Sequence, residues 1–338
     1  METVFFTLLF PLLFSLSFIF TAKRTGLFLE KDFTNVIKGL CCILVVYVHI
    51  RDKYQNPLQD AIGSFAYVAV TLFFLFSAYG MLYSLKKNKL YLTNFWRNRL
   101  VSLLIPCFLV NLVGGLIKFC KGDCLSIIYF LHISDYVVVL LQWCLWFYIV
   151  SICKKKWFDS DERLFDVLLI AGVIISSLVL YFFFDAEFGW CYERIGLVWG
   201  VLLYRHLEKI SSWMSSRNKA TIFLLTTLGL IFGVAYLKFK MVYFIGAYLL
   251  KIVLGITLIV LLFTVTSNLT TSNKLCRWLG DISYEVYLSH GLVIGFFAEQ
   301  LIFEMNSGVF IFLSFLGTLI LSTLIHSLSK PIVAYFRS

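Results

Sequence analysis

Two ionisable residues of one apolar segment have a spacing suited to chemistry. Lys38 and His49 both lie in the apolar stretch 34–50. Eleven residues make close to three helical turns, so both side chains project to one face, about 16 Å apart along the axis. Ionisable groups within a membrane span commonly mark a substrate path. The structural alternative is a lysine that reaches the headgroups and a histidine near the other membrane surface.

A second histidine follows two tyrosines near the end of the chain. Tyr284, Tyr287 and His290 recur every three residues, which predicts a polar stripe on an inward-facing side of a helix. The preceding Gly-Asp pair predicts a turn and a helix N-cap. In the alternative interpretation, His290 is satisfied by a carbonyl of a neighbouring helix.

Small and basic residues lie between these two histidines. Ser77 belongs to a group of small residues within an aromatic segment, where a helix or a ligand can approach closely. Arg97 and Arg99 begin a later apolar segment, and two arginines at a helix start suit phosphate groups. Anchoring of the chain at the cytoplasmic surface explains these two arginines equally well.

The elements that must position these residues are membrane helices. The chain of 338 residues is 60% hydrophobic and 14% charged, whereas soluble domains are about half apolar and a quarter charged. This composition excludes a soluble enzyme and a disordered chain. Lipid accepts only helices or closed barrels, and apolar runs of about twenty residues favour helices. We therefore predict an all-α polytopic transmembrane helix bundle.

The apolar runs that are bounded by charge predict eleven spans. They lie near 3–22, 34–50, 62–85, 100–117, 136–153, 164–184, 190–206, 220–237, 242–267, 283–303 and 308–328. No internal repeat and no separate soluble domain are visible.

Basic residues alternate between the predicted loops. One set of alternate loops and tails carries 20 lysines and arginines, and the opposite set carries seven. The positive-inside rule then predicts an external N-terminus and a cytoplasmic C-terminus. Anionic lipid explains the net charge of +10, so we expect no nucleic-acid partner.

Nine cysteines are scattered through the chain without a Cys-x-x-Cys pair. This pattern predicts no metal site, and most of the cysteines should be packing residues. Cys120 and Cys124 share one outer loop, so a disulfide could form between them.

Five segments together resemble the membrane-bound acyltransferase 3 family. They are the Lys38–His49 spacing, the aromatic segment 73–78, the stretch 95–106, the aromatic patch 142–148, and Gly-x-Ile-Ser-Tyr-x-x-Tyr-Leu-x-His at 280–290. Lysine stands at 38 where the family usually has arginine. The resemblance covers 32–333. It implies a ten-span core there, preceded by an extra N-terminal span and linker at 1–31 and followed by a cytoplasmic tail at 334–338.

The resemblance implies an acyltransferase of the inner (cytoplasmic) membrane. Its donor would be cytoplasmic acyl-CoA, most often acetyl-CoA, as a co-substrate with no resident cofactor. Its acceptor would be a hydroxyl of a cell-surface or exported glycan, or of a lipid-linked saccharide. Besides membrane lipids, no other partner is implied.

The resemblance also implies which residues form the site. His49 would be catalytic together with Lys38, either as a general base or as a nucleophile that holds the acyl group. The substrate-binding residues would be Ser77, Arg97, Arg99, Trp146, Tyr284, Tyr287 and His290. A secondary transporter or flippase for a lipid-linked glycan is the alternative function, although such proteins commonly contain repeats.

Overall fold

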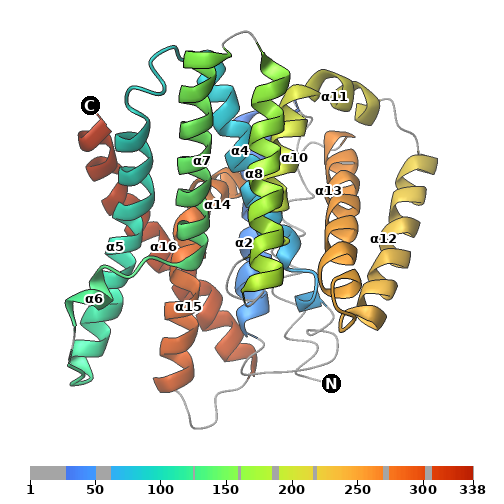
Figure 1. Cartoon of the computed structure of the whole chain (residues 1–338). Helices are drawn as coiled ribbons and strands as arrows, with labels where there is room; N and C mark the ends of the chain where they lie inside the picture. Colours follow the sequence, from blue (N-terminus) through green and yellow to red (C-terminus); the bar gives the residue numbers. More distant parts are fainter. Residues whose placement is uncertain are drawn as a thin grey trace.

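A computed structural model describes most of the chain as a bundle of helices (Figure 1). It describes residues 28–50, 62–124, 126–158, 161–184, 190–215, 219–268, 274–300 and 307–337. The long elements are α2 (Lys31–Ile50), α4 (Tyr67–Lys87), α5 (Phe95–Cys120), α7 (Asp135–Trp157), α8 (Glu162–Phe183), α12 (Lys219–Phe239), α13 (Lys251–Asn268), α15 (Ser283–Gln300) and α16 (Ser307–Arg337). Shorter elements are α6 (Ile127–Phe130), α10 (Ile195–Arg205), α11 (Leu207–Ser215), the π-helix η1 (Ile245–Leu250) and α14 (Lys274–Asp281). The described elements are all helical, which confirms the predicted class.

Eight helices of the described part are long and apolar enough to cross a membrane. They are α2, α4, α5, α7, α8, α12, the continuous η1–α13 and α16. Two further predicted spans coincide with α10, which has only 11 residues, and with α15, whose polar stripe lowers its hydropathy. The predicted span 3–22 lies outside the described residues. The structure thus supports a polytopic membrane bundle, and the count of eleven spans stays a prediction.

Loops predicted to share one side of the membrane meet at one end of the bundle. Glu162, at the start of α8, accepts hydrogen bonds from Lys154 of α7 and from Arg205 of α10. Arg97 Nη2 donates to the carbonyl oxygen of Arg337, 2.8 Å away. These contacts gather the α4–α5 and α7–α8 connections and the C-terminus at the upper end in Figure 1. We call this the basic end.

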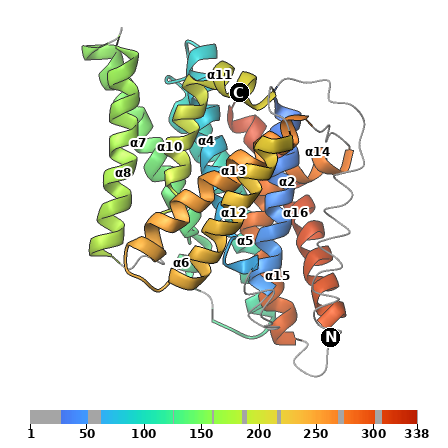
Figure 2. The same cartoon turned by 90° about the vertical axis from the view of Figure 1, so that its right-hand side faces the viewer.

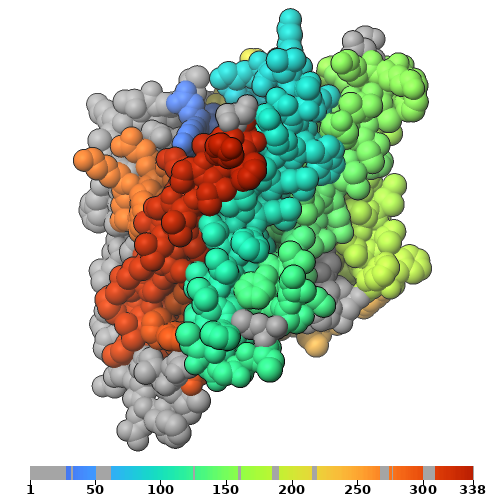
Figure 3. All heavy atoms as spheres, turned by 90° about the vertical axis from the view of Figure 1, so that its left-hand side faces the viewer, coloured from blue at the N-terminus to red at the C-terminus, as the bar shows by residue number. Residues whose placement is uncertain are grey.

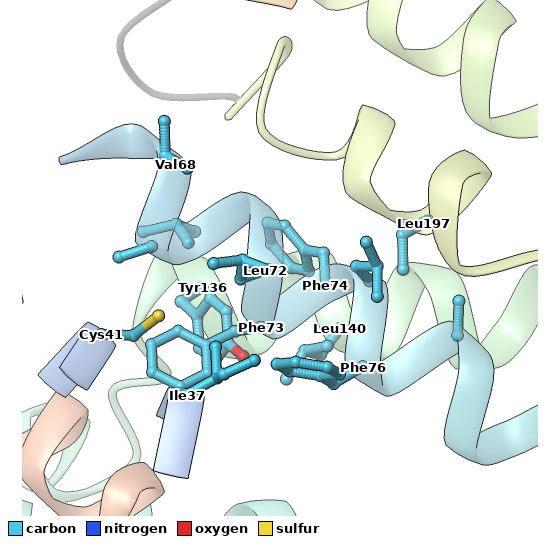
Figure 4. Packing of buried hydrophobic residues seen from close by; sticks show 14 of the residues in the cluster. Ile37, Cys41, Val68, Leu72, Phe73, Phe74, Phe76, Tyr136, Leu140 and Leu197 are labelled. Carbon is cyan, nitrogen blue, oxygen red and sulfur yellow. The ribbon is translucent and has the colours of Figure 1, made fainter. Parts of the chain in front are cut away.

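The core forms around α4, which lies centrally in the bundle. Phe74 and Ala78 are fully buried there, and Figure 4 shows aromatic side chains of α4 meeting Ile37 of α2 and Tyr136 of α7. Helix α10 packs closely along α4, since a Cβ on Gly200 would lie 2.4 Å from the carbonyl oxygen of Leu75 and 2.8 Å from the Cβ of Ala78. The small residues of α4 thus serve helix packing on one side, as membrane helices commonly require.

The Gly-Asp pair before α15 holds two helices together. Gly280 lies in α14, where a Cβ would come within 2.4 Å of the backbone of Asn35 in α2. Asp281 Oδ1 accepts a hydrogen bond of 3.0 Å from Asn35 Nδ2. Both residues of the pair belong to α14, which ends at Asp281, and only Ile282 separates that helix from α15. The turn predicted at this pair is therefore wrong, and so is the predicted N-cap.

Polar contacts join α15 to α16 inside the bundle. Ser289 and Ser322 hydroxyls lie 2.8 Å apart, and His326 Nδ1 lies 3.0 Å from Glu285 Oε1. Such interhelical contacts stabilise helix pairs in lipid. Helix α16 also lies along α5 on the face shown in Figure 3.

Helices α12 and α13 form an antiparallel hairpin at one side of the bundle (Figure 2). The connection is tight, because a Cβ on Gly246 would lie 1.6 Å from the carbonyl oxygen of Phe239. Only glycine fits such a close approach. The turn places Lys251, the first residue of α13, near the end of the bundle opposite the basic end. Cys120 and Cys124 are both free and exposed, so the possible disulfide between them is not formed.

Candidate active site between two pockets

A pocket of about 360 Å³ opens toward the basic end. It brings together residues of α2, α4, α5, α7 and α15, and we call it the basic-end pocket. Its lining residues are Lys38, Phe73, Phe76, Ser77, Gly80, Ser84, Arg99, Tyr136, Ser283, Tyr284 and Tyr287. Five of the residues singled out in the sequence therefore share one pocket: Lys38, Ser77, Arg99, Tyr284 and Tyr287.

Local contacts orient the polar groups of the basic-end pocket. Arg99 Nη2 donates a hydrogen bond of 2.6 Å to the Tyr91 hydroxyl, and its guanidinium lies over the Phe95 ring. The Tyr284 hydroxyl donates to the carbonyl oxygen of Leu103, 2.7 Å away. The described lining contains two cations, Lys38 and Arg99, and no carboxylate. This combination suits a ligand that carries phosphate groups.

A second pocket, of about 570 Å³, lies toward the opposite end of the bundle. We call it the His49 pocket. It is lined by Val45, Val48, His49, Gly63, Ser64, Ala66, Tyr67, Val70, Trp190, Tyr192, Glu193, Tyr236, Lys240, Met241, Ala247, Lys251 and Tyr287. Both pockets have volumes usual for small-molecule sites, which are about 300–1,000 Å³.

Tyr287 lines both pockets and thus stands between them. Its ring centroid lies 4.3 Å from that of Tyr136 and 5.7 Å from that of His290. A movement of this one side chain would therefore change the separation of the two pockets. The predicted stripe on α15 does face inward, because Tyr284 and Tyr287 line the basic-end pocket and His290 is buried.

His49 and His290 form a ring contact beside Tyr287. Their centroids lie 4.5 Å apart, and the ring planes meet at 64°. His49 Nδ1 lies 2.8 Å from the carbonyl oxygen of Val45, and His290 Nδ1 lies 3.2 Å from that of Val286. A carbonyl only accepts, so a neutral ring in this geometry carries its proton on Nδ1. Each Nε2 then keeps its lone pair, the state that a general base or a nucleophile needs.

Two residues singled out in the sequence lie away from both pockets. Arg97 is exposed and donates a hydrogen bond to the C-terminal backbone. It points away from Arg99 because residues two apart on a helix do not share a face. Trp146 lines a separate apolar cavity between α7 and α8, where its Nε1 donates to the carbonyl oxygen of Leu168, 3.1 Å away. The structure does not bring these two side chains to the histidine pair.

Several polar residues of the His49 pocket were not indicated by the sequence, among them Tyr67, Glu193 and Lys251. Glu193 is 6% exposed and lies in the turn before α10. An acid in a connection between spans looks like an ordinary loop charge, so only the fold shows that it is buried. In the described part of the chain, no three His, Cys, Asp or Glu side chains are grouped closely enough to hold a metal ion.

Helices that can cross a membrane, together with two pockets that share Tyr287 beside a histidine pair, define a polytopic membrane protein with an internal site. Residues 32–327 match the acyltransferase domain of the acyltransferase 3 family. Because this match covers most of the chain, the protein belongs to that family. No curated protein and no solved structure matches the chain. The family resemblance expected from the five motifs is thereby confirmed, and the protein is a membrane acyltransferase.

Proposed function

We propose that the protein transfers an acyl group, most simply acetyl, from acyl-CoA to a hydroxyl of a cell-surface or exported glycan. The basic end faces the cytoplasm of the inner membrane in this proposal, as the excess of lysine and arginine in its loops indicates. The proposal depends mainly on one observation, which is that the two pockets share Tyr287 and that the histidine pair lies beside this residue.

The basic-end pocket is the donor site in this proposal. Acyl-CoA carries several phosphate groups, and Lys38 and Arg99 supply the positive charge that attracts them. Ser77 and Gly80 leave the α4 wall of the pocket open, so the pantetheine arm can run along α4 toward Tyr287. The thioester then arrives close to the boundary with the His49 pocket.

His49 acts as the general base, with the acceptor hydroxyl in the His49 pocket. Its Nε2 takes the hydroxyl proton while the hydroxyl oxygen attacks the thioester carbonyl. The C–S bond breaks, and CoA leaves as the thiol after it takes up that proton. A covalent acyl-histidine would use the same Nε2 lone pair, so the geometry serves either route.

Transfer of radiolabelled acetyl from acetyl-CoA by the purified protein tests this proposal. We expect label in a glycan acceptor only when protein, donor and acceptor are all present. The mass of the cell-surface glycan should also fall by one acetyl group per modified site in cells that lack the protein. Movement of an unmodified lipid-linked glycan across vesicles, without labelling, would favour the transporter instead.

A further inference from the structure

Glu193 is a buried acid that the proposed reaction does not use. It lies in the turn that precedes α10, its side chain is 6% exposed, and it lines the His49 pocket. Glutamate is almost never buried unless it is paired, because burial removes the carboxylate from water. Its position on this pocket therefore calls for a partner.

One oxygen of the Glu193 carboxyl group has a partner and the other has none. The neighbouring Tyr192 side chain hydrogen-bonds the carboxyl group. Oε2, in contrast, meets no hydrogen-bond donor within the described part of the chain, although it is shielded from solvent. Buried polar atoms of native proteins almost always have a partner, so an unpartnered oxygen on a residue that lines a pocket points to a ligand.

Aromatic side chains line the same pocket as this carboxyl group. Tyr67, Tyr192, Tyr236 and Trp190 all line the same pocket. The Lys251 ammonium lies over the Tyr192 ring at 3.6 Å from its centroid, so this cation is held against the wall. Aromatic walls with a few well-placed polar groups are the usual lining of a site for a small ring-shaped ligand.

We propose that Glu193 Oε2 accepts a hydrogen bond from a hydroxyl of the acceptor sugar, whose ring lies between the aromatic walls. This inference rests on the proposed function and names the specificity-determining residue of its acceptor site. The bond would fix which hydroxyl faces His49 on the other side of the pocket. A site built to hydrogen-bond a substrate hydroxyl also rejects analogues that lack it.

The test measures sugar binding directly, separately from transfer. Purified protein in nanodiscs free of maltoside detergent is titrated with the methyl pyranosides of glucose, galactose and mannose and with their monodeoxy derivatives. The readout is tryptophan fluorescence, since Trp190 lines the pocket. We expect Glu193→Gln to weaken binding by about 10- to 100-fold, as loss of a hydrogen bond to a charged group does.

Asp166→Asn is the matched control. Asp166 also has one carboxylate oxygen without a partner in the described structure, but it pairs with Arg205 at the basic end, 2.6 Å away. This variant should bind the sugars as the wild type does. If Glu193→Gln fails to fold, Glu193→Asp keeps the charge and should weaken binding while it preserves the preference for the same hydroxyl.

The deoxy sugars distinguish this hydrogen bond from a purely structural role of Glu193, which would weaken the binding of all the sugars alike. If the bond exists, the wild type should lose affinity for one particular deoxy sugar, and Glu193→Gln should lose no further affinity for that same sugar. Equal affinity of wild type and Glu193→Gln would overturn the inference, as would a wild type that binds no pyranoside. Sugar binding that depends on Glu193, without any acetyl transfer, would overturn the proposed function and leave Glu193 only as a residue that binds sugar.

Discussion

The imidazole rings of His49 and His290 lie 4.5 Å apart, although 241 residues separate them in the chain. Each ring is tied through Nδ1 to a carbonyl of its own helix. Helices α2 and α15 therefore each fix one imidazole beside Tyr287. His49 faces the larger pocket, whereas His290 is 7% exposed behind it.

His290 is therefore expected to position His49 rather than to touch the substrate. His290→Ala should lower kcat by about tenfold, less than general-base loss costs, and should leave both KM values nearly unchanged. His290→Gln, which keeps a side chain of similar length, should restore part of kcat. Steady-state kinetics with both substrates check this, and an equal rise of both KM values would indicate general damage to the fold.

The two arginines of α5 should differ in their effect on the donor. Arg99 lines the basic-end pocket, whereas Arg97 is exposed and bonds the C-terminal backbone. Arg99→Gln should raise the KM for acetyl-CoA by about 10-fold, because a charge-assisted contact to phosphate is lost. Arg97→Gln is the matched control and should change that KM by less than about twofold. Similar donor affinity in the wild type and Arg99→Gln would reduce Arg99 to a topology anchor.

The packing of α14 on α2 should tolerate no side chain at 280. A Cβ there would come within 2.4 Å of Asn35, so Gly280→Ala must displace a helix. Overpacking of this kind typically costs about 1–3 kcal/mol. Gly295→Ala is the control, because a Cβ at that position meets nothing within 4 Å. Thermal unfolding in detergent should show a lower Tm for Gly280→Ala alone.

Reporter fusions test which side of the membrane the basic end faces. Fusions after Ser338 and within 154–160 should both report a cytoplasmic location, because the loops of this end carry most of the basic residues. The two sites are predicted to share a side. An external signal from either fusion would contradict the assigned orientation.

Most of the helices could be predicted from the sequence, because a membrane span is defined by local hydropathy. Ten of the eleven predicted spans coincide with described helices, while the first lies outside the described residues. The sequence could not show that α10 would be short or that Gly280 would serve packing. Both depend on the neighbours α4 and α2, which hydropathy does not record.

The candidate site was predictable only in part, for a similar reason. Helical spacing placed Lys38 and His49 on one face of α2, and motif spacing singled out His290. Neither indicated that the two imidazoles would contact each other, because spacing within one helix says nothing of its partner. Arg97 and Arg99 are equivalent in the sequence, and only the structure shows that they point to different sides of α5. Glu193 lies in a turn, so no helical periodicity could single it out.

The rate of acetyl transfer by His49→Ala shows whether this histidine performs the chemistry. The variant should fold with a yield close to that of the wild type, since the removed side chain faces a pocket. Loss of a general base typically costs about 10²–10⁴ in rate, so transfer to the acceptor should nearly vanish. Lys38→Arg, measured alongside, should keep most of the activity, because the positive charge stays. Near-normal transfer by His49→Ala, with His290→Ala inactive, would place the chemistry on α15 and rule out His49 as the base.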